Sequence, residues 1–133
     1  MKSVEVARQF VARINAGDVE GIVALMSPDH KFVDSLGREI LGREDMKSAW
    51  IEYYRVIPDY HIEVESALCD GALVAFFGKA RGTYTPDGIL REENEWTVPG
   101  AWRARIDGDT VAEWQIYIDG EPIRKCIRGE SNK

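Results

Sequence analysis

The chain has 133 residues with 17 basic and 23 acidic side chains, so its formal net charge is 17 − 23 = −6. This length fits one domain, and an acidic chain lacks the positive surface that nucleic-acid binding requires. No apolar run approaches the ~18 residues of a membrane helix, and the first residues do not form a secretory signal. We therefore expect one domain over residues 1–128, a disordered tail over 129–133, a cytoplasmic location, and neither a nucleic-acid nor a membrane partner.

The residue types that hold metals and cofactors are sparse. Cys69 and Cys126 are far apart and form no CxxC pair, which predicts two free thiols. His30 and His61 are also widely separated, so no spacing typical of metal ligands occurs. A glycine-rich phosphate loop is absent as well. The sequence therefore predicts no metal and no cofactor.

The N-terminal third predicts two helices and a short strand. Ser3 is expected to cap the first helix, whose apolar residues recur at helical spacing until Gly17 ends it. Asp18 is expected to cap a short second helix, and Ser27–Pro28 is expected to stop it. Residues 30–34 are typical of a strand.

The third helix has the clearest pattern. Its apolar and aromatic residues follow the i, i+3, i+4, i+7 spacing of one helix face: Met46, Ala49, Trp50, Tyr53, Tyr54 and Ile57. Pro58 ends this helix, and the period then changes to two over residues 61–68, which predicts a strand. Asp70–Gly71 predicts a tight hairpin into a strand over 72–82.

The remaining residues predict a long connection and two more strands. Residues 83–95 contain turn residues and many charges, so we expect a loop there. Residues 96–106 are interrupted by Pro99–Gly100, which indicates a bulge or an edge, and the inward or outward phase of residues 92–102 stays open. A turn at residues 107–109 leads into a last strand over 110–118.

This order of elements predicts an α+β fold. Consecutive hairpins imply a mostly antiparallel sheet, and one long amphipathic helix needs a sheet face to cover. A twisted sheet that curls around such a helix leaves a conical cavity between the two. We therefore expect a cone-shaped curved sheet with a central pocket.

Several stretches, in order and at fitting spacings, carry a family resemblance. They are residues 15–18, 32–37, 41–44, 57–64 and 111–117. Together they resemble the nuclear transport factor 2-like superfamily, in its SnoaL-like and ketosteroid-isomerase-like branch. The resemblance implies a cystatin-like α+β barrel around a pocket, and a homodimer formed through the outer sheet face. This fold hosts isomerases, dehydratases, cyclases, epoxide hydrolases and non-enzymes, so fold alone does not give the function.

Asp34 is the candidate catalytic residue. The resemblance places Asp34 where the ketosteroid isomerases carry their catalytic base, facing the cavity at the end of the first strand. A carboxylate in an apolar cavity is a better proton acceptor near neutral pH, because its charged form is disfavoured. Asp34 also begins the turn sequence 34–37, where an Asp side chain often bonds nearby backbone N–H groups. The two roles are compatible.

Three positions depart from the enzymes that the chain resembles. The oxyanion-donor positions of the isomerases fall on Phe10 and Trp102, which argues against steroid isomerisation. Limonene epoxide hydrolases need an Arg and two Asp around an attacking water, and their last-strand Asp position falls on Ile116. Glu95 is a second carboxylate that could pair with Asp34 if it points inward.

A set of mainly aromatic residues lies on elements that should face the interior. The candidate pocket residues are Trp50, Tyr54, Trp102, Trp114, Ile116, Phe10 and His30. They can stack a flat hydrophobic ligand, or they can pack as ordinary core. For His30 the alternative is a cap on the first strand.

Three hypotheses about function remain open. The first is a small cofactor-independent enzyme of isomerase, dehydratase or polyketide-cyclase type, with Asp34 as general acid or base on a hydrophobic carbonyl compound. The second is a protein that binds a lipophilic small molecule without turning it over. The third is a dimeric interaction scaffold.

Overall fold

The computed structural model describes residues 2–130 and residue 132. The helices are α1 (Ser3–Asn15), α2 (Val19–Ala24), α3 (Arg43–Val56), the short 3-10 helix η1 (Glu92–Asn94) and α4 (Glu121–Ile127). The strands are β1 (Met26–Val33), β2 (Glu39–Leu41), β3 (His61–Asp70), β4 (Leu73–Thr83), β5 (Glu95–Asp107) and β6 (Thr110–Ile118). They form one six-stranded sheet in the order β2-β1-β6-β5-β4-β3.

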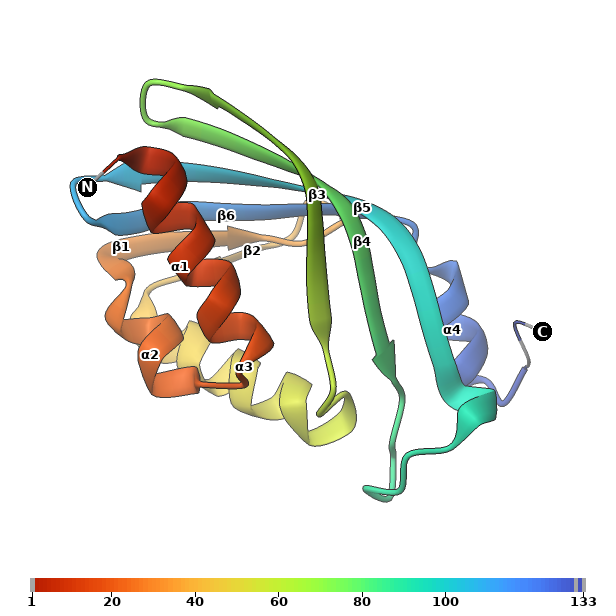
Figure 1. Cartoon of the computed structure of the whole chain (residues 1–133). Coiled ribbons are helices and arrows are strands. Elements are labelled where there is room, and N and C mark those ends of the chain that lie inside the picture. The colour runs from red at the N-terminus through yellow and green to blue at the C-terminus, as the bar shows by residue number, and fades with distance from the viewer. Residues whose placement is uncertain (1, 131, 133) are drawn as a thin grey trace.

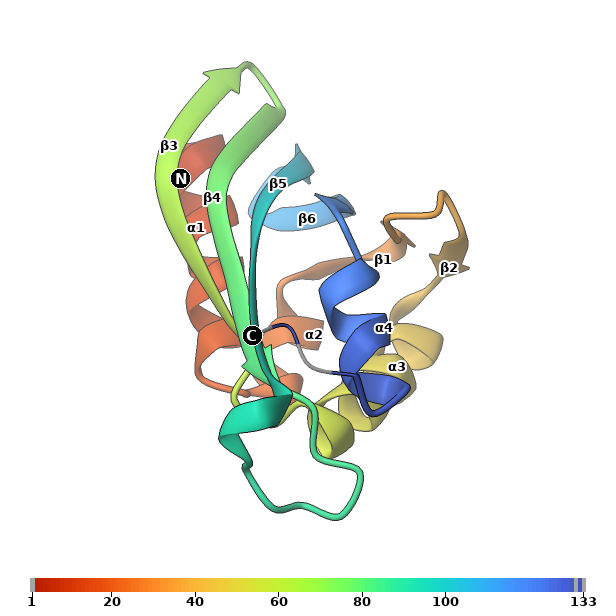
Figure 2. The same cartoon turned by 90° about the vertical axis from the view of Figure 1, so that its right-hand side faces the viewer.

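The sheet is mostly antiparallel, as predicted. Neighbouring strands form antiparallel pairs throughout, except that β1 runs parallel to β6. The sheet curves strongly, with α1 and α3 on its concave side and α4 beside the N-terminal part of β5 (Figures 1 and 2). This is the curved α+β arrangement expected from the sequence.

Irregular pairing accompanies the curvature. The β3–β4 register shifts between Val64 and Ser66, and the β5–β6 register shifts between Arg105 and Ile106. Such bulges bend a strand and increase its twist. Gly78 lies opposite the first shift, where a Cβ atom would overlap the Glu63 carbonyl oxygen. The close approach of these two strands therefore requires glycine.

The core lies between the helices and the concave sheet face. The buried face of α1 consists of Val6, Ala7, Phe10, Val11 and Ile14. It packs against fully buried sheet residues that include Phe76, Trp102 and Trp114. The Tyr54 hydroxyl donates to the Ile14 carbonyl oxygen and thereby ties α3 to the end of α1.

Two of the four helix-boundary predictions in the N-terminal third differ from the structure. Gly17 follows the end of α1 with a φ of 65°, as predicted. Asp18 caps α2 as predicted, since its Oδ1 accepts the Gly21 N–H at 3.0 Å. The Ser3 prediction was wrong, because the N-cap of α1 is Lys2 and no side chain caps that end. Helix α2 ends at Ala24, and Pro28 lies inside β1 rather than at a helix end. A strand tolerates this proline because β1 has no β6 partner between Met26 and Lys31.

Pro99 and Gly100 sit at a local edge and not at a bulge. Both residues keep regular register with β4, where Lys79 faces Pro99 and Gly78 faces Gly100. On the other side, pairing with β6 begins only at Gly100, opposite Ile118. Pro99 therefore lies where β5 has one neighbouring strand, which is where a residue without an N–H fits.

The structure adds three short elements that the sequence did not predict, β2, α4 and η1, the last of which lies in the expected loop over 83–95. Helix α4 has a proline in its first turn, a position that favours helix starts. In the segment predicted to be a disordered tail, the N–H groups of Gly129 and Glu130 donate to carbonyl oxygens of α4, and residues 131 and 133 lie outside the described residues.

Both cysteines are free thiols, as predicted, with Cys69 exposed and Cys126 buried. Within the described part of the chain, no helix is long and apolar enough to cross a bilayer.

Candidate functional site

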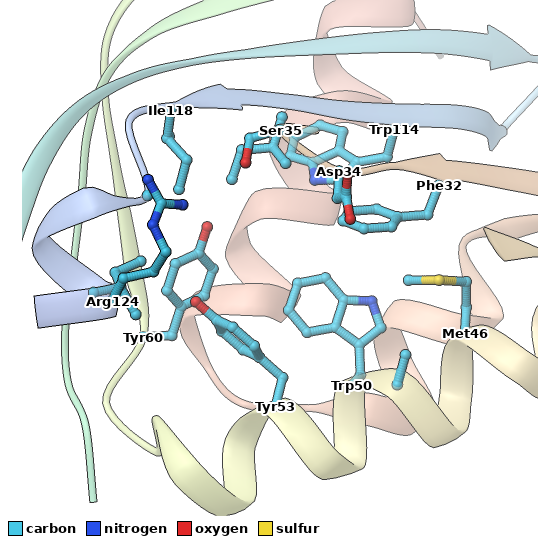
Figure 3. Close-up of a pocket in the computed structure, with 14 residues that line it drawn as sticks. Phe32, Asp34, Ser35, Met46, Trp50, Tyr53, Tyr60, Trp114, Ile118 and Arg124 are labelled. Carbon is cyan, nitrogen blue, oxygen red and sulfur yellow. The ribbon is translucent and has the colours of Figure 1, made fainter. Parts of the chain in front are cut away.

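A cavity of about 360 Å³ opens between α3, the end of β1, β6 and α4 (Figure 3). The residues that line it are Phe32, Asp34, Ser35, Met46, Ala49, Trp50, Tyr53, Tyr60, Trp114, Ile116, Ile118, Gly120, Ile123 and Arg124. This volume lies within the range of small-molecule pockets. Most of the wall is aromatic or aliphatic, so the cavity favours a hydrophobic ligand.

Trp50 is the centre of the aromatic wall on α3. Its ring stacks on Tyr54, with ring centroids 5.5 Å apart. The Trp50 ring also meets Tyr53 edge-on at a centroid distance of 6.0 Å and lies tilted against Tyr60 at 6.4 Å. The indole N–H of Trp50 is buried and has no acceptor among the described residues. These contacts fix the position of Trp50 before any ligand binds.

Asp34 follows directly after β1 and lines the cavity while it also organises a turn. Its Oδ1 accepts the backbone N–H groups of Leu36 and Arg38, each at 2.9 Å. The other carboxylate oxygen takes no part in these two bonds. The turn role and the cavity position are therefore combined in one side chain. Among the described residues that line the cavity, Asp34 is the one carboxylate.

The end of the cavity near α4 carries hydrogen-bond donors. Tyr53 and Tyr60 meet edge-on with centroids 5.0 Å apart. Burial raises the pKa of both phenols well above the usual range, so both stay protonated and can donate. The Arg124 guanidinium lies at the same end in Figure 3, and its Nε donates to Glu121 at 3.2 Å.

The predicted pocket residues divide into two groups. Asp34, Trp50, Trp114 and Ile116 line the cavity. Tyr54, Trp102, Phe10 and His30 do not line it: Tyr54 is half-buried against the core, and the other three are buried. The Tyr54 hydroxyl is used by the Ile14 carbonyl oxygen, and Trp102 is 1% exposed.

Phe10 is fully buried next to Trp114, with ring centroids 5.0 Å apart, and next to His30 at 6.0 Å. Phe10 and His30 lack access to the cavity because the Trp114 side chain forms its wall at this point. At the positions of the isomerase donors, Phe10 and Trp102 therefore present no group to the cavity.

His30 lies in the middle of β1, so the strand-cap interpretation was wrong. Its Nδ1 is 2.7 Å from the Val111 carbonyl oxygen, and since a carbonyl only accepts, Nδ1 carries the proton. Burial lowers the pKa of His30. The Nε2 atom is buried and has no partner among the described residues. His30 is thus a neutral core residue that ties β1 to β6.

The structure also defines the phase of residues 92–102. Trp96, Val98 and Trp102 are buried on the inner face, whereas Glu95 is exposed. Glu95 is not part of the cavity wall. It therefore does not pair with Asp34.

Several wall residues were not singled out from the sequence. Tyr53 lay on the predicted face of the third helix, so its pattern could have indicated it. Tyr60 follows Pro58–Asp59 in a connection, where no periodicity applies. Arg124 belongs to α4, and nothing in the local sequence connects it with a cavity that also includes Asp34 and Trp50, far earlier in the chain.

The fold and the cavity together define a small α+β protein of the nuclear transport factor 2-like, or cystatin-like, type. Residues 7–114 match the SnoaL-like domain family, and the chain belongs to this family.

Comparisons with solved structures support the same fold. A protein from Shewanella denitrificans proposed to be a SnoaL-like polyketide cyclase superposes with a TM-score of 0.82 at 12% identity, over 96% of this chain and 98% of that one. A protein with a ketosteroid isomerase-like fold from Catenulispora acidiphila, solved with trimethylamine, gives a TM-score of 0.73 at 20% identity, over 85% of this chain and 84% of that one. These identities show the fold and not the reaction.

One curated enzyme shares a short segment. The epoxide hydrolase LasB of Streptomyces lasalocidi is 48% identical over 40 residues, which make up 29% of this chain. The matched segment spans 14% of the length of that enzyme.

Proposed function

We propose that this protein is a cofactor-independent enzyme that transfers a proton on a hydrophobic carbonyl compound, with Asp34 as the general base. The observation that carries the proposal is a single half-buried carboxylate in the wall of a largely apolar cavity. A cavity of about 360 Å³ accommodates a compound of two or three fused rings. Isomerisation, dehydration and aldol-type cyclisation all begin with such a proton transfer.

The local geometry fits this role. The two N–H groups of the turn hold one oxygen of Asp34, which fixes the carboxylate without a second side chain. The other oxygen can accept a proton from the carbon next to a carbonyl group. The C–H bond then breaks, its electron pair moves to the carbonyl oxygen as an enolate, and the proton on Asp34 returns to another carbon or to a leaving hydroxyl.

Two alternatives are less well supported. Epoxide hydrolysis of the kind that uses two acids around a water would need a second carboxylate in the cavity. Ile116 occupies the expected position of that acid, and Asp34 is the one acid among the described lining residues. Binding without turnover is favoured by the involvement of Asp34 in its turn. A protein that binds a ketone without removing its proton would fit this second alternative.

The test measures proton removal directly. 2-Tetralone, a small bicyclic ketone, would be incubated with the protein in D₂O, and loss of its α-proton signals would be followed by NMR. We expect the native protein to accelerate the exchange and Asp34→Asn to slow it by about 10²–10⁴-fold. The amide oxygen of Asn can still accept the two turn N–H groups, so the fold should be kept.

The matched control is Asp87→Asn. Asp87 is another carboxylate at the start of a tight turn, it pairs with Arg91, and it does not line the cavity. Its variant should exchange as fast as the native protein. Exchange that persists in Asp34→Asn would refute the role of Asp34. Ligand binding without any exchange in the native protein would favour the binding alternative.

A further inference from the structure

The polar groups of the cavity are unevenly distributed. The phenol oxygens of Tyr53 and Tyr60 and the Arg124 guanidinium lie toward the α4 end, whereas Asp34 lies beside Phe32 and Trp114 (Figure 3). All three groups at the α4 end are donors when both phenols are protonated. This end of the cavity therefore offers hydrogen bonds to an acceptor and contains no carboxylate of its own among the described lining residues.

The two phenols are held in place by packing. Tyr60 is 5% exposed and contacts Trp50, Tyr53 and Trp96. Burial raises the pKa of the Tyr60 phenol, so its hydroxyl stays protonated and can donate to a ligand.

Arg124 supplies the positive charge. Among the described residues that line the cavity it is the one cationic side chain. Its Nε donates to Glu121 at 3.2 Å, while Arg128 approaches the other oxygen of Glu121 more closely, at 2.6 Å. Glu121 is thus shared between two arginines, and the planar guanidinium of Arg124 keeps further N–H groups for a ligand.

We propose that the Tyr53, Tyr60 and Arg124 end of the cavity binds a carboxylate carried by an aromatic or alicyclic ligand. A carboxylate accepts charge-assisted hydrogen bonds from a guanidinium, and repulsion from Asp34 keeps it at the α4 end. The substrate class is then a ring-containing keto acid. The orientation of its reacting carbon toward Asp34 rests on the proposed function, whereas the carboxylate subsite does not.

The test uses two probes of the same shape, 2-naphthoate and the neutral 2-acetylnaphthalene. Their dissociation constants would be measured by calorimetry, with quenching of Trp50 and Trp114 fluorescence as a second signal. We expect the native protein to prefer 2-naphthoate. Arg124→Gln should weaken 2-naphthoate about tenfold, since the side chain is half-exposed, and should leave 2-acetylnaphthalene within about twofold.

Arg128→Gln is the matched control. Arg128 lies at the C-terminal end of α4 and pairs with the same Glu121, but it does not line the cavity. Its variant leaves Glu121 to pair with Arg124 alone, but exposed ion pairs are weak, so both probes should bind within about twofold of the native protein. Tyr60→Phe removes only the phenol oxygen and should weaken 2-naphthoate a few-fold, which tests the subsite independently of Arg124.

The outcomes separate this proposal from the proposed function. Equal affinity for the two probes in the native protein, or an anion preference that survives Arg124→Gln, would overturn the carboxylate subsite and leave Asp34 untouched. Anion preference together with normal exchange in Asp34→Asn would support the subsite and overturn the general base. Failure of both probes to bind would overturn the subsite as well.

Discussion

At the scale of single residues, His30 shows how one buried side chain limits the pH range of the fold. Its pKa is lowered in the folded protein, mainly by burial, from an ordinary value of 6.5. Above that value the ring is neutral in both the folded and the unfolded chain, so it contributes no pH dependence. As the pH falls below 6.5, the unfolded chain takes up a proton that the folded protein excludes, and the free energy of unfolding decreases.

The first stability prediction concerns this histidine. Between pH 7.5 and pH 5.5, His30→Gln should lose less stability than the native protein, with a difference in slope of up to about 1.4 kcal/mol per pH unit. Urea unfolding followed by circular dichroism at several pH values measures it. His61→Gln is the comparison variant. Burial and Arg81 lower the pKa of His61 while Glu63 raises it, but His61 is partly exposed, so its variant should change the slope less than His30→Gln does. Parallel curves for native protein and His30→Gln would contradict the prediction.

Asp34 shows a second residue-scale feature, namely two tasks in one side chain. Its Oδ1 organises the turn between β1 and β2, so a variant without any acceptor would change the shape of the cavity wall. Asn keeps the acceptor and removes the charge. For this reason Asp34→Asn tests chemistry, whereas Asp34→Ala would mix chemistry with loss of the turn.

At the scale of elements, the β3–β4 pair depends on Gly78. The register shift between Val64 and Ser66 brings the Glu63 carbonyl against the Cα of Gly78. Backbone atoms cannot move away as a side chain can, so a Cβ at this position forces the strands apart. The bend that results from this bulge helps to place the sheet around the helices and the cavity.

Gly78→Ala should therefore destabilise the protein by about 3 kcal/mol or more, at the upper end of single substitutions. Gly108→Ala is the control. Gly108 has φ +60° and open space around its Cα, so its variant should lose only about 1–2 kcal/mol from backbone strain. Urea unfolding compares the two. A loss at Gly78 no larger than that at Gly108 would show that the strands adapt.

At the scale of the whole molecule, the convex sheet face carries exposed apolar side chains. Phe77, Ala101 and Tyr117 are direct neighbours across β4, β5 and β6, and Phe77 and Tyr117 are 45% and 49% exposed. Beside them, Glu113 is buried in ion pairs with Arg103 at 2.7 Å and Arg105 at 3.6 Å. A contiguous apolar patch with a polar border is typical of an interface.

We expect the protein to form a homodimer through this face. Phe77→Lys should weaken the dimer at least tenfold, because it places a charge at the centre of the patch. Leu90→Lys is the matched control, since Leu90 is exposed in the connection between β4 and β5 and lies off the sheet face. Light scattering across a dilution series gives the dissociation constant. A native protein that is monomeric at micromolar concentration would refute the dimer.

Much of this architecture could be predicted because local patterns report local geometry. The period of 3.6 over α3, the alternation along β3 and the Asp70–Gly71 turn each depend on residues close together in the chain. Asp34 could be assigned to the end of β1 because a turn signature follows that strand at once. The short elements β2 and α4 were missed because so few residues carry too little periodicity to stand out.

The sequence by itself determined the fold class, the order of the main elements and the place of Asp34. Only the tertiary structure decided which aromatic residues meet the cavity. Trp102 and Trp114 lie on neighbouring strands with similar local patterns, yet Trp102 is buried in the core away from the cavity and Trp114 forms part of the wall. Arg124 reaches the same cavity from α4. The physical reason is that a curved sheet brings distant strands and the C-terminal helix together, and the curvature depends on long-range register that no local pattern encodes.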